Sequence, residues 1–435
     1  MIETLQQFAL MDALVSNWDG IRVRMGTLDA ALERELARLL DELRGAVTSD
    51  QIAVLVDRLL DVTDTTPASD YVRQLVSRAD VSTFDTNRGV VSDRSGEAFA
   101  GAALSAAART LGQAAVEADG FVPVPIFFAT NRRLHPGNAV DERFGGEWVE
   151  ALSYGRAHVT IPSSHRMGRM ERPVLAFESR ERHVVLDALD ALDASAFAAE
   201  LERSGRQRDL LIFLHGYNVT FEEAARRAAQ FATDALFDGV VVLFSWPSAG
   251  ATLRYLADED SAAKSSVPLA AFLKELEGGP WTRVHIVAHS MGNRVALAGL
   301  ASRANVNLPL TNVVFVAADV DTQLFEQQFP ALRPRAGDTG RRLTSYASNS
   351  DRALWLSRWF HHTNRVGRIA DEPFVTADLE TIDASAVDSS LLGLNHGYFG
   401  QERSVLTDLG ELLRHGRSAS GRQLKSVRQW WTFQA

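Results

Sequence analysis

Residues 284–294 read Val-His-Ile-Val-Ala-His-Ser-Met-Gly-Asn-Arg, and the rest of the chain can be interpreted by reference to this stretch. A β-prone run leads into Ser290, with small residues two positions before it (Ala288) and two positions after it (Gly292). A helical pattern follows at once. This is the layout of a nucleophile elbow, a strained turn between strand and helix that presents a serine and needs small neighbours. Ala in place of the usual first Gly is a tolerable departure, because it adds only a methyl group.

Composition excludes several classes of protein. The 435 residues allow two or three domains at ~150 residues each. A net charge of −10 argues against a nucleic-acid binder, and the absence of cysteine excludes disulfides, thiolate chemistry and Cys-ligated zinc. No window reaches the ~18 apolar residues of a membrane span, and the first residues lack the pattern of a signal peptide. We therefore expect a cytoplasmic protein with no membrane span and no nucleic-acid partner.

Residues 1–119 have helical patterns and are predicted to form a separate N-terminal region. Amphipathic segments start at Thr27, Thr48 and Thr66, and an Ala-rich helix is expected over about 97–118. The region contains no cluster of catalytic side chains. We interpret it as a helical bundle that docks a protein partner, or alternatively as one that only packs on the next domain.

From Phe121 the pattern changes to short apolar runs that, later in the chain, alternate with helical segments at about 221–237, 267–277, 290–303 and 351–360. This alternation predicts βαβ units and an α/β fold, with a mostly parallel sheet covered by helices on both faces. We assign residues 120–415 to this domain, with a closing helix at 402–414, and 416–435 to a C-terminal tail with an aromatic end. The expected strands are 122–130, 158–161, 183–186, 210–214, 240–244, 284–288, 313–317, 343–346 and 379–382.

The turn after the strand 210–214 is the expected source of an oxyanion hole. It reads His-Gly-Tyr-Asn, and Gly216 lets the backbone pass close to a substrate. The backbone N–H groups of Tyr217 and Met291 would then converge on one oxygen, where negative charge develops in acyl transfer. His215 itself is interpreted as a structural histidine that bonds to the backbone.

Two neighbouring features support this turn. Thr220 and Glu223 have the spacing of a capping box, which predicts a helix directly after the turn. The segment 244–250 ends the strand before the elbow strand, and its Trp246 offers a large apolar surface. We interpret Trp246 as a wall of the substrate pocket; the alternative is a packed loop corner.

A serine nucleophile needs a base and an acid, which in this layout follow it in the order acid, then histidine. His396 lies in a Gly-flanked loop after the last expected strand and is the predicted base. Asp351, after the strand 343–346, is the predicted acid. Asp319 and Asp321, one strand earlier, stay open as alternatives, and Asp383 is a minor one.

Taken together, these stretches resemble a bacterial esterase/lipase-like family of the α/β-hydrolase superfamily. The resemblance covers about residues 121–400 and implies the α/β-hydrolase fold, with Ser290 as nucleophile, His396 as base and Asp351 as acid. One departure is Ala318, where the family is expected to have Pro. The resemblance does not settle the substrate. The matching pieces are 125–132, 154–155, 161–162, 215–218, 244–248, 288–293, 319–321, 346–354 and 395–399.

The leading hypothesis is a cofactor-free serine hydrolase that cleaves a carboxylic ester or related acyl bond through an acyl-enzyme. The alternative is an interaction protein that residues 1–119 recruit to an assembly, with hydrolysis minor or lost. A metalloenzyme is disfavoured, because the histidines lack ligand spacing such as H-E-x-x-H and the pair Asp319 and Asp321 is insufficient alone.

Overall fold

The computed structural model divides the chain into two compact units, Met1–Ser92 and Asp93–Ala435. The predicted N-terminal bundle, Asp351 and His396 lie outside the residues that the structure describes. The strands and helices named below all belong to the second unit. The described residues are Arg38 and residues 120–172, 178–204, 208–248, 255–302, 307–334, 340–349, 364–387 and 402–434.

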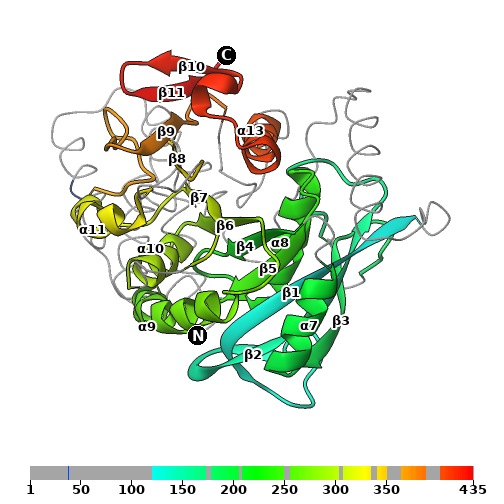
Figure 1. Ribbon diagram of the computed structural model, residues 1–435. Coiled ribbons are helices and arrows are strands. Elements are labelled where there is room, and N and C mark those ends of the chain that lie inside the picture. Colours follow the sequence, from blue (N-terminus) through cyan, green and yellow to red (C-terminus); the bar gives the residue numbers. More distant parts are fainter. Residues whose placement is uncertain are drawn as a thin grey trace. The chain divides into compact units, whose positions relative to one another are not determined.

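One sheet of eleven strands runs through the described part of this unit, in the order β10-β11-β9-β8-β7-β6-β4-β5-β1-β2-β3 (Figure 1). The seven neighbouring pairs from β1 to β11 are parallel, and the antiparallel pairs lie at the two ends. The expected mostly parallel sheet is confirmed. The strands are β1 (Phe121–Leu134), β2 (Phe144–Pro162), β3 (Val185–Leu192), β4 (Asp209–Leu214), β5 (Val240–Ser245), β6 (Arg283–His289), β7 (Leu310–Val316), β8 (Arg342–Ala347), β9 (Leu379–Asp383), β10 (Leu424–Val427) and β11 (Trp430–Phe433).

Helices cover both faces of the sheet. The apolar side chains of α8 and α13 pack with one face, and those of α7, α9, α10 and α11 pack with the other. Within β4, Leu211 and Phe213 belong to the first core and Leu210, Ile212 and Leu214 to the second, which is why this strand is apolar throughout. The helices are α7 (Ala194–Ser204), α8 (Phe221–Asp234), α9 (Tyr255–Glu275), α10 (Gly292–Ser302), α11 (Thr322–Gln328) and α13 (Glu402–His415), with 3-10 turns η2 (Phe329–Leu332) and η4 (Ala419–Gly421).

The start of α8 is as predicted. Thr220 caps the helix, its side chain accepts from the Glu223 N–H, and the Glu223 carboxylate accepts from the Thr220 N–H. The capping box fixes where the chain turns from the loop after β4 into the helix. It therefore also fixes the far end of the predicted oxyanion turn.

The ends of the sheet differ from expectation. β2 spans Phe144–Pro162 instead of 158–161, and residues 424–433 form a hairpin whose β11 pairs in parallel with β9. Polar residues and glycines interrupt the apolar pattern of β2, and β10 and β11 have only four residues each, so pairing with their neighbours holds these strands in place. The C-terminal residues thus extend the sheet.

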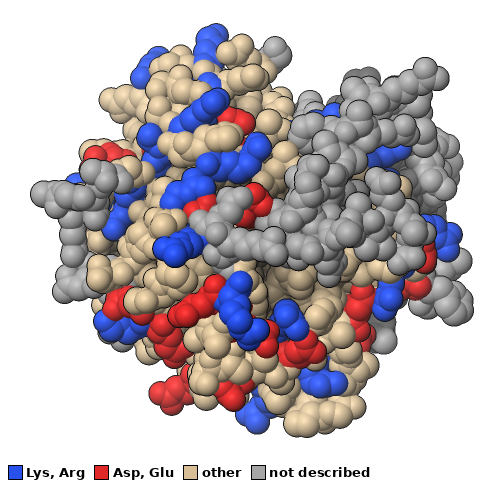
Figure 2. Space-filling model, turned by 45° about the vertical axis from the view of Figure 1, so that its right-hand side comes forward, with Lys and Arg blue, Asp and Glu red and all other residues tan. Residues whose placement is uncertain are grey.

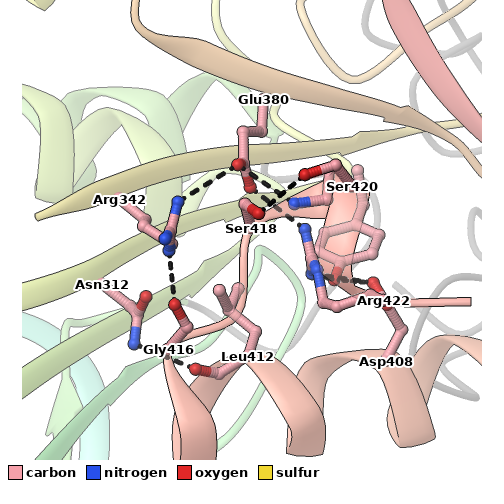
Figure 3. A network of polar contacts seen from close by, with 11 residues as sticks. Asn312, Arg342, Glu380, Asp408, Leu412, Gly416, Ser418, Ser420 and Arg422 are labelled. Carbon is pink, nitrogen blue, oxygen red and sulfur yellow. Dashed lines mark hydrogen bonds and ion pairs between the residues drawn. The ribbon is translucent and has the colours of Figure 1, made fainter. Parts of the chain in front are cut away.

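A buried polar network joins the second half of the sheet to α13 and the segment after it (Figure 3). The Arg422 guanidinium donates to the Asp408 carboxylate (2.9 Å), to the Tyr346 hydroxyl (3.0 Å) and to Glu380 (3.1 Å). The Tyr346 hydroxyl donates to Asp408 at 2.5 Å, and Arg342 pairs with Glu380 at 3.4 Å. Burial raises the pKa of Asp408, and Arg422 works against that shift.

Exposed ion pairs are also numerous. Figure 2 shows Lys and Arg side chains next to Asp and Glu over much of the described surface in that view. Arg428 and Glu372 form one such pair, with both side chains largely exposed. Exposed pairs contribute little to stability, typically about 0–1 kcal/mol, because water and salt screen them.

We predict that Arg422→Met lowers the free energy of unfolding by about 3–5 kcal/mol, because it leaves the buried Asp408 carboxylate without its cation. Arg428→Met, which removes an exposed arginine, is the matched control and should change it by less than about 1 kcal/mol. Urea denaturation followed by circular dichroism measures both. Equal effects of the two substitutions would contradict the buried network.

A second buried cluster holds residues 165–171 against α8. His165 lies between two carboxylates, with Nδ1 2.7 Å from Glu171 Oε2 and Nε2 2.9 Å from Asp234 Oδ1. Gly168 N–H also donates to Asp234. Burial alone lowers the pKa of His165, but Asp234 and Glu171 outweigh it and raise that pKa to about 10. The imidazole is therefore doubly protonated at neutral pH.

This cluster predicts a specific pH dependence of stability. Because the folded pKa of His165 (about 10) exceeds the ordinary value of 6.5, its contribution is complete below pH 6.5 and is lost as pH rises toward 10. The difference in unfolding free energy between the wild type and His165→Gln should therefore shrink over that range. Urea denaturation at several pH values checks this, and a constant difference would argue against a charged His165.

Candidate active site

Ser290 occupies the turn between β6 and α10, and its backbone is in the left-handed region with φ of +50°. This conformation costs a non-glycine residue on the order of 1–2 kcal/mol. Ser290 is only 5% exposed. A serine held in this conformation between a strand and a helix is the geometry that the sequence pattern predicted.

Close packing explains the small residue after the serine. A methyl group added at Gly292 would lie 2.3 Å from the carbonyl oxygen of His215 and 3.1 Å from that of Leu214. Both atoms are backbone and cannot move cheaply. Ala288, on the strand side, is buried in the core, where its methyl group fits.

Four hydrogen bonds hold the strained turn. The Ser290 N–H donates to Val316 O at 2.9 Å, which ties the turn to the end of β7. The Ser290 carbonyl accepts from Asn293 N (3.1 Å), Asn293 Nδ2 (2.9 Å) and Asp319 N (3.2 Å). Strain of this kind persists only where the surroundings over-determine the backbone, and such residues cluster at functional sites.

The turn lies at the topological switch point of the sheet. From β4 the chain crosses to β5 on one side and then returns to β6 on the other. Connections that depart in opposite directions leave a crevice outside the carboxyl ends of the two strands, where ligands bind in open α/β sheets. The carboxyl ends of β4 and β6 carry the turn 215–218 and Ser290.

The two predicted oxyanion donors follow the carboxyl ends of the neighbouring parallel strands β4 and β6. A methyl group added at Gly216 would lie 3.0 Å from Ser290 Cβ and 2.8 Å from His289 Nδ1, so the turn packs directly on Ser290. Tyr217 N–H follows Gly216. Met291 is fully buried, and within the described part of the chain its N–H donates to no protein acceptor.

Trp246 is fully buried beside the same turn. Its indole N–H donates to the His215 carbonyl at 2.8 Å, and its ring stacks on the His215 imidazole with centroids 5.1 Å apart. These contacts support the turn from the protein side. The role of Trp246 as a wall of the substrate pocket stays a prediction.

The alternative acids have other partners. Asp319 is buried, and its carboxylate pairs with Arg365 (3.2 Å) and Arg294 (3.5 Å). Asp321 caps α11, and the Asp383 carboxylate accepts from Ser385 N–H at 2.8 Å. Asp351 and His396, the predicted acid and base, lie outside the described residues.

The described histidines near the serine are poor bases. Burial, reinforced by the Arg132 guanidinium, lowers the pKa of His215 well below its ordinary value. Burial, with Arg227, lowers the pKa of His289 to about 3. A general base works best with a pKa near the operating pH, so neither imidazole suits the role.

Comparison with known proteins agrees with this geometry. The family model "alpha/beta hydrolase of unknown function (DUF900)" matches residues 191–414, just over half of the chain. The chain belongs to this α/β-hydrolase family. No curated protein matches the sequence significantly.

Solved structures give weak likenesses. A hyperthermophilic esterase from the archaeon Pyrobaculum calidifontis is 13% identical, with a TM-score of 0.28, over 80% of this chain and 97% of that one. The monoclinic form of the Pyrobaculum calidifontis esterase is 12% identical, with a TM-score of 0.28, over 79% and 97%. At such TM-scores the likeness carries no argument about function.

Three residues around the oxyanion turn of this α/β hydrolase were missed from the sequence. Arg132 donates to the Val219 carbonyl, and the Ser248 hydroxyl oxygen accepts from the Val219 N–H. The Asp258 carboxylate accepts from the Asn218 N–H. Arg132 lies near the end of the mostly apolar strand β1 and Ser248 follows β5, both at the edge that carries Ser290, which was the available signal. Among the described residues, no group of three or more His, Asp or Glu side chains has the arrangement of a metal site.

We predict that Gly292→Ala disrupts the elbow, because the added methyl group meets the His215 carbonyl. The loss of stability should be about 1–3 kcal/mol, as for other overpacked sites, with slower labelling of Ser290 by a fluorophosphonate. Gly421→Ala is the matched control, since its methyl group would meet nothing closer than 3.7 Å. Thermal unfolding and labelling kinetics measure both variants; equal behaviour would count against the close approach.

Proposed function

We propose that this protein is a serine hydrolase that cleaves a carboxylic ester or a related acyl bond through an acyl-enzyme. The observation that carries the proposal is the left-handed Ser290 at the switch point of the sheet, packed against Gly216 of the turn after β4. A nucleophile beside backbone donors is the arrangement that acyl transfer requires.

The reaction proceeds in two stages. Ser290 Oγ attacks the acyl carbon while His396 takes its proton, and the oxyanion that forms accepts hydrogen bonds from the N–H groups of Tyr217 and Met291. Collapse expels the leaving group, which receives the proton from His396. A water molecule, deprotonated by His396, then attacks the acyl carbon of the acyl-enzyme. As the ester bond to Ser290 breaks, His396 returns the proton to Ser290 Oγ and the acid is released.

The assignment of base and acid rests on strand direction. Strands β6 to β9 are parallel, so β8 and β9 end at the same edge of the sheet as Ser290. Asp351 follows β8 and His396 follows β9 in the sequence. The carboxylates of Asp319 and Asp321 already bind arginines and a helix N-terminus, which favours Asp351 as the acid that orients His396.

Docking of a protein partner through residues 1–119 is a separate proposal. It predicts a role for those residues in location or control and does not alter the chemistry at Ser290. Among the described residues, no helix is long and apolar enough to cross a membrane.

We predict that a fluorophosphonate labels the wild type and not Ser290→Ala. Hydrolysis of p-nitrophenyl esters of graded chain length should fall by about 10³-fold or more in Ser290→Ala and His396→Ala, because members of a triad act as a unit. Asp351→Asn should lower the hydrolysis rate less than Ser290→Ala or His396→Ala does, but far more than Asp321→Asn does. Mass spectrometry of the labelled protein and steady-state kinetics provide the measurements.

The outcomes separate the hypotheses. If the folded wild type is neither labelled nor active, the hydrolase hypothesis is wrong and the interaction-protein hypothesis is favoured. A larger loss in Asp319→Asn or Asp321→Asn than in Asp351→Asn would move the acid to the loop after β7.

A further inference from the structure

Arg132, at the end of β1, is 1% exposed, yet no carboxylate bonds directly to it among the described residues. All five of its N–H groups have acceptors. Burial lowers its pKa to about 9, against the attraction of Asp258 and Glu223, so it stays protonated at neutral pH. The acceptors are Ser245 Oγ (2.9 Å), Gly145 O (3.1 Å), Ser248 O (2.8 Å), His215 Nε2 (3.3 Å) and Val219 O (2.7 Å).

The contact with His215 decides which imidazole nitrogen carries the proton. A guanidinium can only donate, so Nε2 of His215 must accept. Because the ring is neutral, its single proton is on Nδ1, which lies 2.7 Å from the carbonyl oxygen of Gly216. Nδ1–H therefore donates to Gly216 O. The Ser245 hydroxyl, 3.2 Å from the same Nε2, can either donate or accept, so it is Arg132 that selects the tautomer.

This hydrogen bond sets the direction of a peptide unit. In a trans peptide the C=O and the N–H point in opposite directions. The Gly216 carbonyl points at the His215 ring, so the Tyr217 N–H of the same peptide points away from it. Gly216 packs on Ser290, which puts this peptide beside the nucleophile.

The same guanidinium also holds the other end of the turn. It donates to Val219 O, while Val219 N–H donates to Ser248 Oγ at 3.1 Å. Between the two ends, Asn218 has a left-handed backbone (φ +56°), and its N–H donates to Asp258 at 3.2 Å. One side chain thus spans the turn from its first residue to its last.

We propose that Arg132 is a positioning residue for the oxyanion hole: through His215 it fixes the Gly216–Tyr217 peptide so that the Tyr217 N–H meets the developing oxyanion. The inference rests on the proposed function. Without Arg132 the imidazole is free to take the other tautomer, and the peptide loses the bond that orients it.

The test uses the full-length protein and a short-chain p-nitrophenyl ester. Arg132→Ala should lower kcat about 10–100-fold, up to the cost of losing one oxyanion donor, with KM changed less than about 3-fold. Such a split shows loss of an interaction made in the transition state. Arg226→Ala, which removes another buried arginine, one that pairs with Glu178 and Glu222, should keep the wild-type kcat.

Two further measurements distinguish positioning from general support of the fold. A hollow of about 300 Å³ borders Arg132, so guanidinium at a non-denaturing concentration should partly restore kcat of Arg132→Ala but not that of Ser290→Ala. The kcat of Arg132→Lys should be lower than that of Arg132→Ala in the presence of guanidinium, because a single ammonium cannot reach both ends of the turn.

A second pair of variants covers the case in which Arg132→Ala does not fold. An Asn at position 215 can donate its amide N–H to Gly216 O from near the place of Nδ1, whereas a Phe can only stack on Trp246. His215→Asn should therefore keep at least about tenfold more kcat than His215→Phe, in line with the 10²–10³ range for a lost oxyanion donor.

The results separate this inference from the proposed function. Suppose that the wild type hydrolyses esters through Ser290. If the folded Arg132→Ala then has the wild-type kcat, or if His215→Asn and His215→Phe have the same kcat, the positioning role is wrong and the proposed hydrolase function is unaffected. If the wild type shows no Ser290-dependent hydrolysis, the proposed function has failed, and Arg132 has no oxyanion hole to position.

Discussion

The constraint on which the site depends is the left-handed backbone of Ser290. A strand that ended in an ordinary conformation would carry the serine into the sheet layer and not above its edge. The left-handed conformation is unfavourable for a serine. It is held by the hydrogen bond from the Ser290 N–H to Val316 on β7 and by three donors to the Ser290 carbonyl. Gly292 then lets α10 start against the backbone of β4. Three adjacent strands must therefore be in place before the turn can form.

The second constraint is the buried, irregular backbone of the oxyanion turn. Buried N–H and C=O groups need partners, and a turn of residues 215–219 cannot supply them from a regular ladder. The polar side chains of Arg132, Trp246, Ser248 and Asp258 do so instead. Burying a guanidinium costs several kcal/mol unless its donors are satisfied, which explains why every N–H of Arg132 has an acceptor.

Much of the fold could be predicted, because strands β4 to β7 are mostly apolar on both faces and stand out in the sequence. The predicted helix at 267–277 is longer in the structure: α9 spans Tyr255–Glu275 and has Pro268 in its interior, a residue more typical of a first helical turn. β10 and β11 were missed, since strands of only four residues at a sheet end are defined by pairing and not by composition. In the site, the elbow and the turn are contiguous motifs. Arg132 is 83 residues from His215, and only the register of β1 against β5 brings them together.

The parallel direction of the strands explains why the residues of the candidate site lie along one edge of the sheet. Along one edge of the sheet, Arg132 lies near the end of β1, β5 ends at Ser245, β4 leads into the turn 215–218 and β6 leads into Ser290. β7 adds the backbone bonds to Ser290, and β8 and β9 lead into the segments that carry Asp351 and His396. Each strand delivers its next residue to the same side because each runs in the same direction. Reversing any one of them would place its contribution on the opposite edge, so the direction of the strands, more than any single side chain, assembles the site.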